Sequence, residues 1–157
     1  MAASVKAYTG VKATAPTDTT TLAPVYRNGR VRVCEDYVTT VNEAQVGSTI
    51  KLGWFPKGSW ILGGTIAGGT LAANVTCTVG VVGVSGTSYD NDADAFNAAT
   101  ALTNTNITMG DNTARVAQTI PYQVTDPKGA YVLVTTANAN TAASNQTITA
   151  SINWVQD

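Results

Sequence analysis

Residues 52–62 read LGWFPKGSWIL, and the chain continues through two glycine pairs to VGVVGV at residues 79–84. Proline fixes its own φ and suits the second position of a tight turn, while glycine adopts the positive φ that other residues resist. The tryptophan, phenylalanine, isoleucine and valine on either side suit the pleated surface of a sheet. This stretch therefore predicts a strand, a turn over Pro56–Ser59, a second strand, a glycine-rich bend and a long third strand.

Short segments of extended, partly alternating sequence follow one another from Gly29 onward, and turn residues separate them. The Gly63-Gly64 pair interrupts one segment, which predicts a bulge or a bend. Roughly eight to ten short strands at this spacing indicate an all-β fold, an antiparallel β-sandwich of residues 29–157, with a jelly roll as first choice. The expected strands cover residues 31–34, 37–41, 49–54, 60–62 with 65–67, 74–84, 106–109, 115–120, 123–125, 131–136 and 147–154.

Residues 90–102 are the one helical candidate. Acidic residues at the start favour a helix N-terminus, and Ala93, Phe96 and Ala99 recur at helical spacing. The segment 90–94, DNDAD, also matches the beginning of an EF-hand loop, although Ala95 and Ala101 stand where that loop needs glycine and glutamate. We expect one short helix, with Asp90, Asp92 and Asp94 either capping it or forming an irregular calcium site.

The composition favours a single domain that works in an assembly. The chain has 157 residues and 44% hydrophobic residues, enough for a packed core, but charged residues make up 12%. Threonine, with 26 copies, supplies much of the polar surface. Little electrostatic repulsion then separates neighbouring copies, which suits an assembly subunit.

Charge and hydropathy argue against two classes of partner. The net charge of −1 gives no basic field to attract nucleic acid. Residues 1–60 carry seven basic and four acidic residues, and residues 61–157 carry two basic and six acidic residues. This asymmetry fits a positive arm that faces a negative surface, and it fits equally well charges that are scattered over the surface and solvated. Glycine and threonine break the apolar stretches before the ~20 residues of a membrane span, and no signal peptide is recognisable, so we expect no membrane partner and synthesis in a cytoplasm.

Residues 1–28 differ from the rest of the chain. Residues 13–24 lack periodicity and contain two prolines among small polar residues, which indicates an extended N-terminal arm. The arm is either a frayed terminus or a segment that orders against a neighbouring subunit. Its apolar contact points are Val5, Tyr8, Val11, Leu22, Val25 and Tyr26.

The sequence offers no recognisable catalytic apparatus. It contains no histidine, which removes the usual general base and most zinc sites, and it has no phosphate-binding glycine loop. We therefore expect no enzymatic activity, no catalytic residues, no metal and no cofactor. Cys34 and Cys77 fall in expected strands and are interpreted as buried free thiols, with a disulfide as the alternative.

The order of these features resembles that of small bacteriophage head decoration proteins, also called capsid-stabilising or cement proteins. The shared features are an apolar strand ending in a Phe-Pro-Lys-Gly turn, a strand closing on Val-Gly-Val, a D-x-D…F segment at residues 90–96, and threonine- and alanine-rich strands up to residues 146–154. The resemblance covers about residues 34–155. It implies a jelly-roll homotrimer on the outer surface of the capsid that bridges major capsid protein subunits, made in the cytoplasm of the host bacterium.

The candidate interface combines the arm with the turn at Pro56. We expect these residues to contact the major capsid protein or a sister subunit: Tyr8, Val11, Leu22, Val25, Tyr26, Arg27, Arg30, Arg32, Trp54, Phe55 and Trp60. The basic cluster 27–32 contacts an acidic neighbour or remains a solvated edge. The aromatic residues, Trp154 included, fill a core or an interface, or they form a sugar-binding platform. In the last case the protein is a tail-fibre or receptor-binding module that recognises host glycan.

Overall fold

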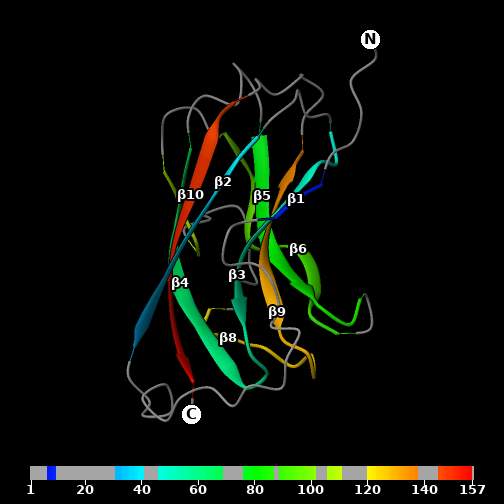
Figure 1. Cartoon of the computed structure of the whole chain (residues 1–157), viewed down its shortest axis with the longest axis vertical. Coiled ribbons are helices and arrows are strands. Elements are labelled where there is room, and N and C mark those ends of the chain that lie inside the picture. The colour runs from blue at the N-terminus through cyan, green and yellow to red at the C-terminus, as the bar shows by residue number, and fades with distance from the viewer. Residues whose placement is uncertain are drawn as a thin grey trace.

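The computed structural model describes residues 7–9, 31–40, 46–68, 76–86, 89–101, 106–110, 120–137 and 145–156. Every regular element in these ranges is a strand, and the strands form two sheets that face each other (Figure 1). The first sheet has the order β1-β3-β9-β5-β6, and the second has the order β2-β10-β4-β7, with β8 paired to β4. The strands are β1 (Ala7–Thr9), β2 (Arg32–Thr39), β3 (Thr49–Phe55), β4 (Ser59–Gly68), β5 (Thr76–Gly83), β6 (Asn91–Ala101), β7 (Ile107–Thr108), β8 (Tyr122–Gln123), β9 (Ala130–Thr136) and β10 (Thr147–Gln156).

The antiparallel pairs are nested along the chain. Strand β2 pairs with β10, β3 with β9, β4 with β7, and β5 with β6. Early strands thus pair with late ones, and the two halves of the chain close over one core. The expected antiparallel β-sandwich is confirmed, and the nesting is compatible with a jelly-roll arrangement.

The expected short helix over residues 90–102 is wrong, because this segment forms strand β6 against β5. Three consecutive residues of β6, Ala95, Phe96 and Asn97, are buried. A helix lying on the surface would instead bury residues three or four positions apart. The pairing is irregular: Val79 lies opposite Asn97, and Val81 lies opposite Asp92. Burial of Phe96 and pairing with β5 outweigh the weak local preference of an alanine-rich segment.

Strand β4 contains the irregularity that its glycine pair predicted. Ile61 lies opposite Trp154 and Gly63 opposite Asn153, so Leu62 is an extra residue without a partner. Gly63 has a φ of 128°, and a Cβ on Gly64 would overlap the carbonyl oxygen of Ser151. The glycines therefore allow β10 to pass close to a bulged strand.

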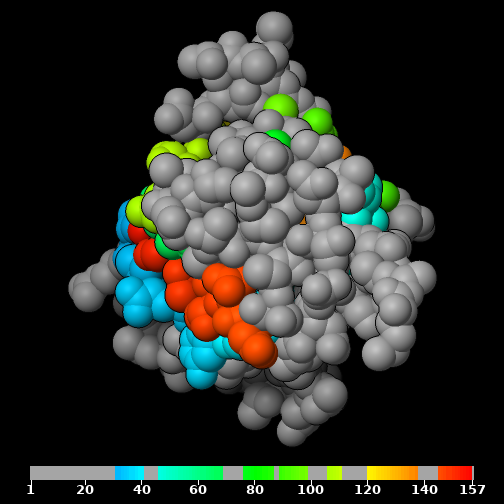
Figure 2. Space-filling model, turned by 90° about the horizontal axis from the view of Figure 1, so that it is seen from above, coloured from blue at the N-terminus to red at the C-terminus, as the bar shows by residue number. Residues whose placement is uncertain are grey.

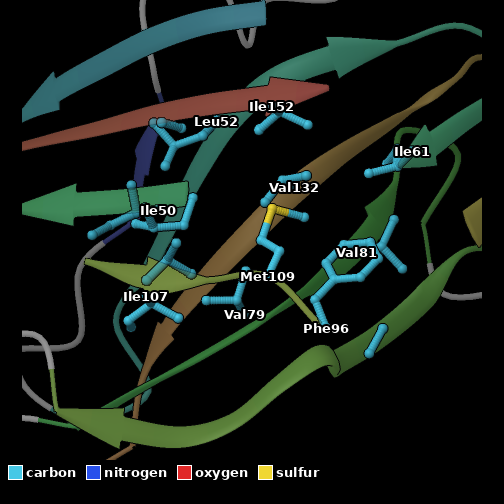
Figure 3. Packing of buried hydrophobic residues seen from close by; sticks show 14 of the residues in the cluster. Ile50, Leu52, Ile61, Val79, Val81, Phe96, Ile107, Met109, Val132 and Ile152 are labelled. Atoms are coloured by element: carbon cyan, nitrogen blue, oxygen red, sulfur yellow. The ribbon is translucent and has the colours of Figure 1, made fainter. Parts of the chain in front are cut away.

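The core lies between the two sheets and is almost entirely aliphatic (Figure 3). Alternate residues of several strands point into it, such as Ile50 and Leu52 of β3 and Ile148 and Ile152 of β10. Phe96 of β6 enters the same cluster and contacts Tyr122 edge to face, with ring centroids 5.7 Å apart. Both sheets thus need β6 in place to complete the core.

The chain differs from the expected strand list in two further places. Residues 32–34 and 37–39, from two of the expected strands, belong to one continuous strand, β2. Residues 7–9 of the expected arm form β1, which pairs with β3 in parallel. Apart from Ile120, the expected strand 115–120 lies outside the described residues, and so does the remainder of the arm. Within the described ranges, no helix is long and apolar enough to cross a membrane.

Candidate functional site

The turn at Pro56 connects β3 to β4 at one end of the sandwich. The Ser59 N–H donates to the Pro56 carbonyl oxygen at 3.1 Å, and Gly58 has a φ of 84°. Pro56 is therefore the first residue of this turn rather than the second, and Gly58 takes the third position, where positive φ is required. The Gly58 N–H and the Ser59 carbonyl are both hydrogen-bonded to Val124, so the turn is fixed on its inner side and presents Lys57 to solvent.

An aromatic cluster lies inside this end of the sandwich. Phe55 is fully buried and contacts Trp154 edge to face at a centroid distance of 5.8 Å. The Arg32 guanidinium lies over the Trp154 ring, 5.2 Å from its centroid. These contacts join β2, β3 and β10, so the cluster holds the two sheets together at this end.

Trp54 is held against the β8–β9 connection. Its Nε1–H donates to the Lys128 carbonyl oxygen at 3.1 Å. Gly129 has a φ of 87°, and a Cβ there would lie 2.7 Å from Trp54 Nε1. Trp54 and Trp60 are each half-buried, on the two sides of the turn.

The structure brings together four of the eleven expected interface residues. Arg32, Trp54, Phe55 and Trp60 gather near the Pro56 turn, and Phe55 among them packs wholly inside the chain. Tyr8 lies in β1, opposite Ile50. The other expected residues, Val11, Leu22, Val25, Tyr26, Arg27 and Arg30, lie outside the described residues. Phe55, Trp154 and Trp54 contact their own chain, which leaves Trp60 without these three rings as a shared exposed platform.

Asp90 is the centre of a buried hydrogen-bond network. Its carboxylate accepts from the Tyr122 hydroxyl at 2.8 Å, from the Thr125 hydroxyl and N–H at 2.9 Å each, and from the Asp126 N–H at 2.8 Å. The pKa of Tyr122 is raised, mainly because the side chain is partly buried. Its hydrogen bond to Asp90 and the negative charge of Asp90 raise this pKa further. The network joins the start of β6 to the segment that follows β8.

Asp126 extends the network toward β5. Its carboxylate accepts from the Ser85 N–H, the Ser85 hydroxyl and the Lys128 N–H, all at 2.7 Å. Burial favours the neutral acid, but these three hydrogen bonds and the charge of Lys128 outweigh it, and the pKa of Asp126 lies below its ordinary value. The carboxylate is therefore ionised and fixed in place.

Asp90, Asp92 and Asp94 are not grouped in the way that a metal centre needs in the described part of the chain. Asp90 is engaged inside the protein, whereas Asp92 is exposed and accepts from the Asp94 N–H at 3.2 Å. Among the described residues, no three side chains of a kind that binds metals lie close enough together to hold an ion. Asp90 is thus a structural hub followed by the exposed start of β6, and the calcium hypothesis gains no support from this arrangement.

Asp36 links the two sheets on the opposite side. Its carboxylate accepts from the Gly53 N–H at the bulge of β3 and from the Tyr37 N–H, both at 2.8 Å. Alternation along β2 predicts its inward position between Cys34 and Val38, so the sequence did contain a signal for a buried acid. Asp36 is not among the site residues expected from the sequence.

No disulfide joins Cys34 and Cys77, as expected, but only Cys77 is buried as both were expected to be. Cys77 is buried in β5, and burial raises its pKa to about 12. Cys34 is half-buried, and a Cβ on Gly53 would lie 3.1 Å from its Sγ. A thiol with so high a pKa carries almost no thiolate at neutral pH, so Cys77 lacks the character of a nucleophile.

Comparison with solved structures places this fold among phage capsid chains. A chain in the capsid of Ralstonia phage GP4 has a TM-score of 0.68 and 19% identity, over 91% of this chain and 94% of that chain. A chain in the capsid asymmetric unit of cyanophage Pam1 has a TM-score of 0.59 and 19% identity, over 90% and 99% of the two chains. Neither the family models nor the curated proteins compared with the sequence match it. The expected resemblance to phage capsid proteins is therefore confirmed at the level of the fold.

Proposed function

We propose that this chain is a non-enzymatic structural protein of a phage virion that decorates and stabilises the capsid. The observation that carries the proposal is the fold shared with the GP4 capsid chain over nearly the full length of both chains. Because both chains are covered almost completely, the similarity extends over the whole sandwich and is not limited to a shared motif. A virion role also agrees with a charge-poor, threonine-rich surface.

The mode of action proposed here is bridging. One copy would contact more than one major capsid protein subunit on the outer surface of the shell, as a homotrimer. Binding to several neighbours at once raises the effective concentration of each further contact, so modest individual contacts give stable attachment. Residues 1–28 and the Pro56 turn are the proposed contacts.

Within the turn, the contact residues are those that face outward. Phe55 and Trp154 are occupied in the chain's own core and are set aside. Lys57 is exposed at the tip of the turn, and Trp60 on β4 is half-buried beside it. An interface centred on a partly exposed tryptophan with a charged residue at its rim has the composition of an interaction hot spot.

The test is co-sedimentation of the purified chain with capsid shells of its own phage that have been stripped of this protein. We expect saturable pelleting, with a stoichiometry close to the number of threefold positions, and a trimeric mass in sedimentation equilibrium. Absence of pelleting with intact shells would refute decoration. A monomeric mass with normal pelleting would refute the trimer alone.

Matched variants locate the contact. Lys57→Glu and Trp60→Ala should weaken pelleting at least tenfold, because truncating a hot-spot residue typically costs about 2 kcal/mol or more. Asp92→Lys is the control: it changes an exposed charge on β6, which lies three strands from β3 in the first sheet, and it should pellet as the unmodified chain does. Equal effects of Lys57→Glu and Asp92→Lys would show that the turn is not the contact.

A further inference from the structure

The outer sides of the two sheets differ in exposure. On the first sheet, the outward residues Tyr131 and Leu133 of β9 are each 8% exposed. On the second sheet, Val33 and Tyr37 of β2 are 57% and 52% exposed. The second sheet thus presents its outer side to solvent, and Figure 2 shows β2 and β10 side by side at the surface of the molecule.

This outer side contains a hollow of about 440 Å³. Strand register places its walls and floor in two rows: Glu35, Ser151 and Thr65 lie in one row across β2, β10 and β4, and Tyr37, Thr149 and Ala67 lie in the next. All six are exposed or half-exposed, and their neighbours along each strand point into the core. The volume lies within the range of small-molecule sites.

The outward side chains of the hollow supply one tyrosine, three aliphatic hydroxyls and the Glu35 carboxylate, whereas Asp36, which also lines the hollow, binds the Gly53 N–H with its own carboxylate. The Tyr37 ring offers an apolar face with negative charge density. Ser151 and Thr65 both donate and accept hydrogen bonds, and the Thr149 hydroxyl donates to the Ala67 carbonyl oxygen at 3.3 Å while keeping its acceptor capacity. Glu35 adds a strong acceptor.

We infer that this hollow binds a neutral carbohydrate. A sugar ring has an apolar face for Tyr37 and hydroxyls at its edge for the side chains of β10, β4 and Glu35. Among the described residues, no basic side chain lines the hollow, and the Glu35 carboxylate repels phosphates and acidic sugars. A protein surface covering it would bury the Glu35 charge and three hydroxyls, each of which would need its own partner.

The site lies apart from the proposed capsid contact. The turn at Lys57 is at the end of the sandwich where β3 passes into β4 (Figure 1). The two rows of the hollow lie toward the other end of β4, at Thr65 and Ala67, and near the start of β10. Binding to the isolated chain does not depend on the virion role.

The test is an NMR titration of the isotope-labelled full chain with neutral trisaccharides: maltotriose, cellotriose and triacetylchitotriose. We expect at least one of them to shift the amide signals of residues 35–37, 65–67 and 149–151 in a saturable way. Lactose and sialyllactose differ by one acidic sugar, so comparing them tests whether the hollow repels negative charge. We expect sialyllactose to bind more weakly than lactose because of the Glu35 carboxylate. Failure of all neutral sugars to shift these signals would overturn the inference.

Three variants separate stacking from general damage. Tyr37→Ala should weaken binding at least tenfold, and Tyr37→Phe, which keeps the ring, should retain it. Tyr89→Ala removes a tyrosine that is 46% exposed elsewhere and should have no effect. Equal binding by Tyr37→Ala and Tyr89→Ala would overturn the inference. Signals of the hollow that shift with protein concentration in the absence of sugar, while sugars leave them unchanged, would identify a contact between copies instead.

Discussion

Replacing Asp90 by alanine tests the network that fixes the start of β6. The change removes the acceptor for the Thr125 and Asp126 N–H groups and for the Tyr122 hydroxyl. A buried donor left without an acceptor costs about 1–3 kcal/mol, and the two backbone donors cannot turn toward water without opening their segment. Relief of the buried charge offsets part of this cost. We expect Asp90→Ala to lower the free energy of unfolding by roughly 3–5 kcal/mol.

The assay is unfolding in urea, with tryptophan fluorescence as the signal that reports the folded fraction. With an m-value of about 2 kcal/mol/M, a loss of about 4 kcal/mol lowers the midpoint by about 2 M. Asp92→Ala is the matched control, because Asp92 is exposed and two residues away, and it should change the stability by no more than about 0.5 kcal/mol. Similar small losses of stability in Asp90→Ala and Asp92→Ala would refute the network. Two exposed acids at the start of a helix would give that result, because each would contribute little.

Three further predictions concern the core, the pH dependence and the thiols. Phe55→Ala should cost about 3–5 kcal/mol in the same assay, against less than about 0.5 kcal/mol for Lys57→Ala, and a small loss for Phe55 would contradict its buried position. The pKa of Asp126 in the folded chain lies below its ordinary value of 3.8. The ionised carboxylate therefore stabilises the fold fully above pH 3.8, and this stability is lost as the pH falls through the pKa of the folded state. Between pH 6 and pH 3, Asp126→Asn should therefore lose less stability than the unmodified chain, and an equal loss would argue against the shift. With a pKa of about 12, Cys77 should react with a thiol reagent only after unfolding, unlike Cys34, and rapid labelling of both in the native chain would contradict the burial of Cys77.

Much of the sandwich was predictable because β-branched and aromatic residues alternate between turn signals. The Pro56 turn, the bulge at Gly63 and the long strand ending at Gly83 follow from local sequence. The failure at β6 has a physical cause: alanine and aspartate carry little strand preference, and the spacing of Ala93 and Phe96 fits a helix. Pairing with β5 decides the outcome, and no local signal reports it.

The candidate sites were less predictable, because they depend on register between strands distant in sequence. Tyr37, Thr149 and Ala67 become neighbours only through two ladders that join β2, β10 and β4. The same holds for Asp90, whose partners lie more than thirty residues away along the chain. Composition indicated an assembly subunit, but it could not show which side of the sandwich stays open.

The pairing of β1 with β3 has a consequence for how this chain stays dispersed before assembly. An uncovered outer strand offers a row of N–H and C=O groups to any other extended chain, and many proteins guard such strands with charges. Only 12% of the residues in this chain are charged. Residues 7–9 protect β3 instead, because they pair with its residues 49–51. The N-terminal segment therefore acts as a built-in cover, so its removal should favour fibrous or amorphous self-association over simple loss of fold.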